Sequence, residues 1–195
     1  GDPLQVAAVS LTNPIFILFM AVANMFGMGG SAVASIALGG QDQKRMRQVS
    51  AFITYASLVV GVLFAGALLV FMQPILTLFG ANEETYAFAK GYVFYISYGA
   101  PFIIWSAAAS FIVRAEGASR EAMIGSMIGT VANIVLDPVL ISGFHLGAAG
   151  AAVATTLGNI LASIYYLWYF IKKSSNFSIS LKYFTCRDGI FSGIC

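Results

Sequence analysis

Asp137 is the one charged residue in an apolar run that spans residues 123–140. Asn133 precedes it by four residues, so in a helix the two side chains share one face, with Thr130 a further turn back on nearly the same face. An ionised Asp at the centre of a bilayer costs about 2.5–3.5 kcal/mol on insertion scales. A chain that bears this cost uses the carboxylate to bind a cation, carry a proton or hold a neighbouring helix.

Pro138 has no N–H, so the carbonyl one turn earlier, near Ile134, loses its helical partner. A carboxylate, an amide oxygen and a freed carbonyl are hard oxygen ligands that suit Na⁺, or a proton on the carboxylate. Antiparallel pairing with the next apolar run brings the Thr155 hydroxyl to a depth in the membrane similar to that of Asp137. The pattern favours a Na⁺ or H⁺ site without another cofactor. Two alternatives stay open: Asp137 ends its helix near the headgroups, or it hydrogen-bonds a neighbouring helix.

The elements that must position these residues are membrane helices. Hydrophobic residues make up 59% of the 195-residue chain and charged residues only 9%, against about 25% charged in ordinary soluble domains. Each long apolar run can cross about 30 Å of hydrocarbon as a helix. Strand-length alternation is absent, so we predict an all-α integral membrane protein. Its five expected spans are 14–38, 50–79, 86–113, 121–141 and 147–171.

Basic residues alternate between successive loops. The loop 41–47, the loop 114–120 and the tail from residue 172 carry Lys and Arg, whereas loops 80–85 and 142–146 carry none. The positive-inside rule places the basic loops in the cytoplasm. Residues 1–13 are then expected outside and residues 172–195 in the cytoplasm. Lys90 is the one Lys or Arg on the outer side.

Other polar and aromatic residues are candidates for a substrate cavity. Asn24 and Asn159 are amides inside apolar runs, which either line a cavity or cross-link helices. Met28 and Tyr98 could line a pocket for apolar cations, in part through aromatic faces. A further aromatic group is typical of an interfacial belt at the end of the last span. Its members are Tyr165, Tyr166, Trp168 and Tyr169.

No enzymatic motif is present. The sequence has no nucleotide-binding glycine loop ending in Lys-Ser or Lys-Thr, no His-Glu-x-x-His and no serine elbow. We therefore expect no enzyme, and any uphill transport to draw on an ion gradient. Cys186 and Cys195 lie in the expected cytoplasmic tail, where a disulfide is not expected. A chain that starts at Gly1 rather than Met reads as part of a longer protein.

Seven stretches, in order along the chain, resemble the multidrug and toxic compound extrusion (MATE) transporters. They include the Gly-Met-Gly-Gly-Ser-Ala of the first span, the Arg-Ala-Glu-Gly after the third and the Asn-Ile-Val-Leu-Asp-Pro of the fourth. The stretches are 13–16, 27–32, 38–39, 99–101, 111–117, 133–138 and 147–155. The resemblance extends to about residue 171.

The resemblance implies twelve helices in two six-helix lobes. Residues 1–171 then correspond to helices two to six of the N-terminal lobe, and residues 172–195 to the inter-lobe linker and the start of the next segment. The DinF-like branch places its cation site at the positions of Asn133, Asp137 and Thr155, with a backbone carbonyl near Ala151. A further Asp lies on helix one, which this chain lacks. The implied partners are that helix, the C-terminal lobe and the bilayer, with no nucleic acid.

The function implied by the resemblance is multidrug efflux: antiport of organic cations and amphiphiles against Na⁺ or H⁺ across the cytoplasmic (inner) membrane. One alternative is a lipid-linked oligosaccharide flippase of the same superfamily, whose cavity is expected to carry Arg and Lys for pyrophosphate. Only Lys90 falls within a span here, which argues for cationic or neutral cargo. The other alternative is a non-transporting membrane receptor or scaffold.

Overall fold

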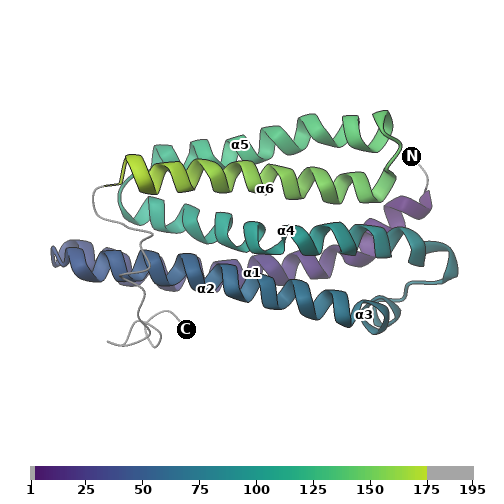
Figure 1. Cartoon of the computed structure of the whole chain (residues 1–195), viewed down its shortest axis with the longest axis horizontal. Helices are drawn as coiled ribbons and strands as arrows, with labels where there is room; N and C mark the ends of the chain where they lie inside the picture. The colour runs from purple at the N-terminus through teal and green to yellow at the C-terminus, as the bar shows by residue number, and fades with distance from the viewer. Residues whose placement is uncertain (1–2, 175–195) are drawn as a thin grey trace.

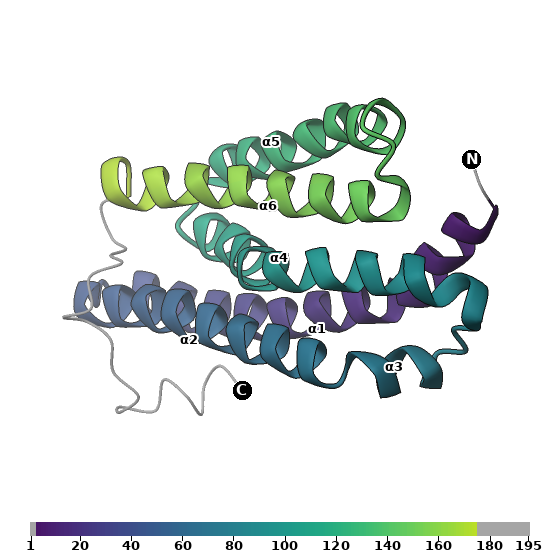
Figure 2. The same ribbon diagram turned by 45° about the vertical axis from the view of Figure 1, so that its right-hand side comes forward.

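The computed structural model describes residues 3–174 as a bundle of long helices (Figure 1). Helix α4 runs through the middle, with α1 and α2 on one side and the α5–α6 pair on the other (Figures 1 and 2). The helices are α1 Pro3–Gly39, α2 Gln43–Val70, α3 Met72–Leu78, α4 Glu83–Ala115, α5 Ser119–Pro138 and α6 Gly147–Lys172, with a π-helical turn, η1 Val139–Gly143, after α5. Within residues 3–174, five helical segments are long and apolar enough to cross a membrane.

The start of α1 and the end of α2 differ from the sequence prediction. Helix α1 begins at Pro3 rather than at Pro14, because Ala8 and Thr12 are buried and continue the packed helix through the proline. Its first turns diverge from α2 (Figure 2). The expected span 50–79 is two helices. Pro74 cannot donate to the carbonyl of Val70 and its ring crowds that carbonyl, so α2 ends there and α3 begins anew.

Helix ends are fixed by local capping. Asn82 accepts a hydrogen bond from the Thr85 backbone N–H at 3.0 Å, and the Thr85 hydroxyl accepts one from the Asn82 N–H at 3.1 Å. This reciprocal pair starts α4. Asp42 caps α2 by accepting from the Arg45 backbone N–H at 3.0 Å. Gly117 takes φ +88° and lets the chain turn sharply from α4 into α5.

The basic loops gather at one end of the bundle. Helix α2 begins there, and α4 and α6 end there, whereas α3 and the turn between α5 and α6 lie at the opposite end (Figure 1). We call the first the basic end; it carries Lys44, Arg45, Arg120, Lys172 and Lys173. Because the chain reverses at each turn, successive loops lie alternately at the basic end and at the opposite end. The predicted orientation in the membrane depends on this alternation.

A polar network closes the basic end around α6. Glu121 accepts hydrogen bonds from the Tyr165 hydroxyl and from the Lys173 ammonium, with which it forms a salt bridge. Glu116 accepts from the Tyr169 hydroxyl at 2.7 Å and from the Ser174 hydroxyl at 2.8 Å. These bonds join the α4–α5 turn to the last turn of α6.

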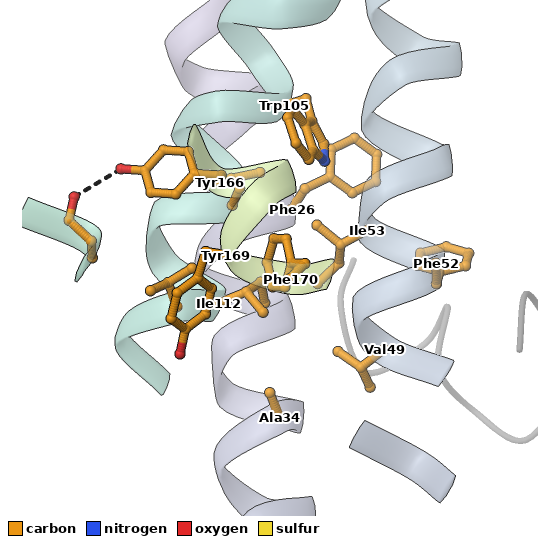
Figure 3. Close-up of a cluster of buried hydrophobic side chains, with 14 of the residues drawn as sticks. Phe26, Ala34, Val49, Phe52, Ile53, Trp105, Ile112, Tyr166, Tyr169 and Phe170 are labelled. Carbon is orange, nitrogen blue, oxygen red and sulfur yellow. Dashed lines mark hydrogen bonds between the residues drawn. The ribbon is translucent and has the colours of Figure 1, made fainter. Parts of the chain in front are cut away.

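Two apolar clusters form the core. Near the basic end, side chains of α1, α2, α4 and α6 interdigitate around Phe26, Trp105 and Phe170 (Figure 3). Nearer the opposite end, α1, α4 and the α2–α3 junction pack around Phe19, Leu76 and Ile103. Helix α4 contributes to both clusters, which explains why it is the most buried helix.

Helices α2 and α4 meet without space for a methyl group at Gly61. A Cβ there would lie 2.4 Å from Cα of Pro101, a backbone atom that has little freedom to move. We predict that Gly61→Ala lowers the free energy of unfolding by about 1–3 kcal/mol through overpacking. The measurement is the thermal unfolding midpoint of the purified full-length protein.

Gly66→Ala is the matched control on the same helix. No atom lies within 4 Å of the added Cβ at Gly66, and Ala favours a helix over Gly by up to about 1 kcal/mol. Gly66→Ala should therefore leave the midpoint unchanged or raise it. Equal midpoints for the two variants would contradict the close α2–α4 packing.

Candidate cation and substrate site

Close packing of α5 against α6 places the first site residues together. A Cβ on Gly158 would lie 2.6 Å from the carbonyl oxygen of Gly129, so the two backbones touch at this level. One turn further along α5, Asn133 donates a hydrogen bond from Nδ2 to Oγ1 of Thr155 at 3.2 Å. The hairpin therefore brings together two of the residues that the sequence predicted to share a site.

Asp137 lies one turn beyond Asn133, immediately before Pro138 and the π-helical turn. Its Oδ1 atom is buried and accepts no hydrogen bond from residues 3–174. An unpaired buried acceptor costs about 1–3 kcal/mol, more when charged. The described residues do not support the alternative in which Asp137 hydrogen-bonds a neighbouring helix. A carboxylate oxygen is a hard ligand, so a proton or Na⁺ is a suitable partner for it.

Asp137 does not hydrogen-bond Asn133 or Thr155. Tyr92 of α4, a buried residue that the sequence did not single out, lies within electrostatic range of Asp137. Ala151 lies within α6, one turn before Thr155, and packs against the core cluster nearer the opposite end. The four predicted cation-site residues thus lie on adjacent turns of α5 and α6, and Asn133 with Thr155 forms the direct contact.

A cavity of about 540 Å³ opens between α1 and α4 on one side and α5 and α6 on the other. It extends from Arg114 and Tyr166, near the basic end, to Asn133 and Thr155. Its lining is Phe16, Met20, Asn24, Ser106, Ala107, Ser110, Phe111, Arg114, Ser126, Gly129, Thr130, Asn133, Thr155, Asn159, Ala162 and Tyr166. The size suits a drug-sized molecule.

A second cavity, of about 300 Å³, continues toward the opposite end. It is lined by Val9, Ser10, Asn13, Phe16, Tyr92 and Thr155. Phe16 and Thr155 line both cavities. Thr155 lies at the junction of the two cavities, and its partner Asn133 lines the larger one; Asp137 lines neither of them.

The predicted cavity residues divide into two groups. Asn24 and Asn159 line the larger cavity; Asn159 accepts from the Ser106 hydroxyl at 2.9 Å and donates to the Thr155 carbonyl at 2.9 Å. Met28 and Tyr98 do not line it, and they are 61% and 58% exposed. Each follows or precedes a glycine that faces a neighbouring helix, so the helical rotation of about 100° per residue turns it away.

Two lining residues correct the interpretation of the sequence. Arg114 was assigned to a cytoplasmic loop, but it lies in the last turn of α4 and faces the cavity. A basic residue in the cavity removes the argument that its cargo must be cationic or neutral. Tyr166 was assigned to an interfacial belt, but it is 1% exposed and donates to the Ala122 carbonyl at 2.8 Å (Figure 3).

The fold and the cavity define a multi-pass helical membrane protein built like one lobe of a transporter. A family model described as MatE matches residues 2–139. The chain belongs to this family of multidrug and toxic compound extrusion transporters. Membership in a transporter family agrees with the expectation that the chain is not an enzyme, and it favours transport over a receptor or scaffold.

Curated relatives share about a third of the residues. The multidrug export protein MepA of Staphylococcus saprophyticus subsp. saprophyticus is 37% identical over 183 residues, covering 94% of this chain and 41% of MepA. MepA of Staphylococcus aureus is 35% identical over 181 residues, covering 93% and 40%. The chain therefore spans about two fifths of the length of these relatives.

Solved structures share the fold. A multidrug resistance MATE family transporter of the MOP superfamily in its inward-facing conformation matches with TM-score 0.93 and 29% identity, over 98% of this chain and 44% of that one. An outward-facing MATE family transporter matches with TM-score 0.93 and 29% identity, over 99% and 43%. The helical arrangement is thus as similar to one conformation as to the other.

We predict that Thr155→Val destabilises the protein modestly, because Asn133 loses its hydrogen-bond acceptor. Interhelical hydrogen bonds in membrane proteins contribute about 0.6 kcal/mol on average and up to about 1.7. Thermal unfolding of the full-length protein would show a lower midpoint for Thr155→Val. Thr155→Ser keeps the hydroxyl and should stay near the wild type. A serine variant as unstable as the valine variant would show that the methyl group, rather than the bond, matters.

Proposed function

We propose that this chain is the N-terminal lobe, without its first helix, of a multidrug exporter in the cytoplasmic membrane. The exporter would exchange amphipathic drugs for Na⁺ or H⁺. The observation that carries this proposal is the buried oxygen of Asp137, which has no partner in residues 3–174 and lies one helical turn beyond Asn133, a residue that lines the larger cavity. The family membership and the multidrug export activity named for MepA support the same conclusion.

In this proposal Asp137 is the coupling group. A cation or proton satisfies its buried oxygen, and Asn133 and Thr155, on adjacent turns, supply further oxygen ligands. Na⁺ is then a transported ion rather than a resident cofactor. A first helix, which precedes the corresponding part of the family fold, would contribute another acidic ligand, and a second lobe would close the pathway.

Coupling requires that the ion bind one conformation more tightly than the other, because an ion with equal affinity for both shifts nothing. The end of α5 is suited to this: Pro138 removes one backbone hydrogen bond, and a π-helical turn follows at once. Ion binding at Asp137 in the outward-open state would change the bend of this segment, alter the adjoining cavity and release the drug. The inward-open state would then reload drug from the cytoplasm or the inner leaflet.

We predict that Asp137→Asn in the full-length protein abolishes coupling, because the amide can neither release a proton nor neutralise a cation. The measurement is efflux of a permanently charged dye such as ethidium from vesicles under an imposed Na⁺ gradient and, separately, a pH gradient. The gradient that drives wild-type efflux identifies the ion. Gradient-dependent efflux should fall at least about tenfold in the variant.

Glu84→Gln is the control, because it also removes one carboxylate charge but lies exposed in the first turn of α4. It should transport like the wild type. Undiminished ion-driven efflux in Asp137→Asn would refute the assignment of Asp137 as the coupling group.

A further inference from the structure

Arg114 is exposed at the end of α4, and its side chain also lines the larger cavity. Its Cζ atom lies 5.5 Å from the centre of the Phe111 ring, one turn earlier on α4, and both residues line the cavity. Helical side chains lean toward the N-terminus of their helix, which for α4 lies at the end opposite the basic end. An Arg near a helix end ordinarily extends to the membrane surface; here the Phe111 ring holds the guanidinium beside the cavity.

The charge of Arg114 has no carboxylate partner within residues 3–174. Glu116 and Glu121, the acidic residues nearest in sequence, bond to residues at the end of α6. The Tyr166 hydroxyl lies within electrostatic range of Arg114. A phenol is neutral, however, and this one donates its hydrogen bond to the Ala122 carbonyl, so it does not neutralise the guanidinium. The cavity therefore contains a cation that no residue in residues 3–174 neutralises.

The serine hydroxyl groups near Arg114 already donate hydrogen bonds to backbone carbonyls of their own helices. Ser110 donates to the Ala107 carbonyl at 2.7 Å, and Ser126 donates to the Ala122 carbonyl at 3.0 Å. Asn24, by contrast, lines the cavity and forms no side-chain hydrogen bond within residues 3–174. The donors left for a ligand in this half of the cavity are the N–H groups of Arg114 and Asn24, which suits an acceptor-rich group.

We infer that Arg114, assisted by Asn24, binds the anionic group of an amphiphile in this cavity. The group is a carboxylate or a phosphate, which a guanidinium can hold by two parallel hydrogen bonds. The apolar part of the amphiphile lies along Phe16, Met20 and Phe111. The inference rests on the proposed function and specifies its substrates: zwitterions fit with the anionic group at Arg114 and the cationic group toward Asn133 and Asp137.

The test compares an amphipathic drug that carries a carboxylate with its methyl ester, both binding to the purified full-length protein. Arg114→Gln should weaken the carboxylate compound about tenfold, the equivalent of losing one charge-assisted hydrogen bond, and the ester less than about twofold. Arg114→Lys keeps the charge and should restore the carboxylate compound to within about threefold of the wild type.

Arg45→Gln is the matched control, since it removes the same charge at the same end of the bundle but lies exposed and away from the cavity. It should affect neither compound. Equal weakening of acid and ester in Arg114→Gln, or equal weakening of the acid by Arg45→Gln, would overturn the inference. Either result would assign Arg114 a structural or long-range electrostatic role.

A second arm separates a soluble carboxylate from a lipid phosphate. Binding is measured in nanodiscs of phosphatidylcholine alone and of phosphatidylcholine with phosphatidic acid. If phosphatidic acid competes with the carboxylate compound, and Arg114→Gln abolishes this competition, a lipid headgroup also occupies the site. If phosphatidic acid does not compete, the occupant is the carboxylate of the soluble amphiphile. In both cases Arg114 is the anion site, whereas competition that persists in Arg114→Gln would contradict it.

Ethidium efflux distinguishes this inference from the proposed function. Ethidium has no anionic group to bind Arg114, so Arg114→Gln should not lower the ratio of ion-driven to gradient-free ethidium efflux, which reports the coupling. Equal effects of Arg114→Gln on the acid and the ester, with ion coupling intact, would refute the anion site alone. Intact coupling in Asp137→Asn, with the acid–ester difference preserved, refutes the coupling role alone.

Discussion

The contact between the backbones of α5 and α6 at Gly129 and Gly158 determines where the polar groups of this lobe can meet. In hydrocarbon, helices associate through close packing and hydrogen bonds, because lipid tails are as apolar as the side chains. The glycines bring α5 so near to α6 that Asn133 reaches Thr155. Helix α5 packs mainly on α6, so the space between this pair and the α1–α4 pair is left as a cavity.

The hydroxyl groups along this cavity satisfy themselves within their own helices. Ser110, Ser126 and Thr130 each donate to a carbonyl three or four residues earlier. This arrangement leaves a polar wall whose one charged group is Arg114, exposed at the end of α4, whereas Asp137, outside the wall, has a buried oxygen without a partner in residues 3–174. Unpaired charges are costly in a membrane and are retained chiefly at sites that bind ions or substrates.

The sequence predicted those features that depend on distance along the chain. A short turn after α5 limits the register of the hairpin, so the spacing placed Thr155 near the depth of Asp137; its hydrogen bond is to Asn133, one helical turn earlier on α5. The rotation of each helix about its axis could not, because helices that are apolar on all sides show no periodic pattern from which to infer their buried face. Met28 and Tyr98 therefore proved exposed, and Tyr166 buried. Arg114 escaped notice because positive-inside reasoning counts a basic residue without asking where its side chain points.

The separation of the two charges gives a physical reason why ion and drug can share one lobe. In the proposed exchanger, the cationic group of a drug would be attracted toward Asp137, where it would compete with Na⁺ or H⁺ for the same carboxylate. An ion bound to Asp137 would give its buried oxygen a partner and neutralise its charge, which would also remove the attraction for the drug. In the proposed exchange this competition would add to the change in the bend of α5, and both require that the ion affinity of Asp137 differ between the two states.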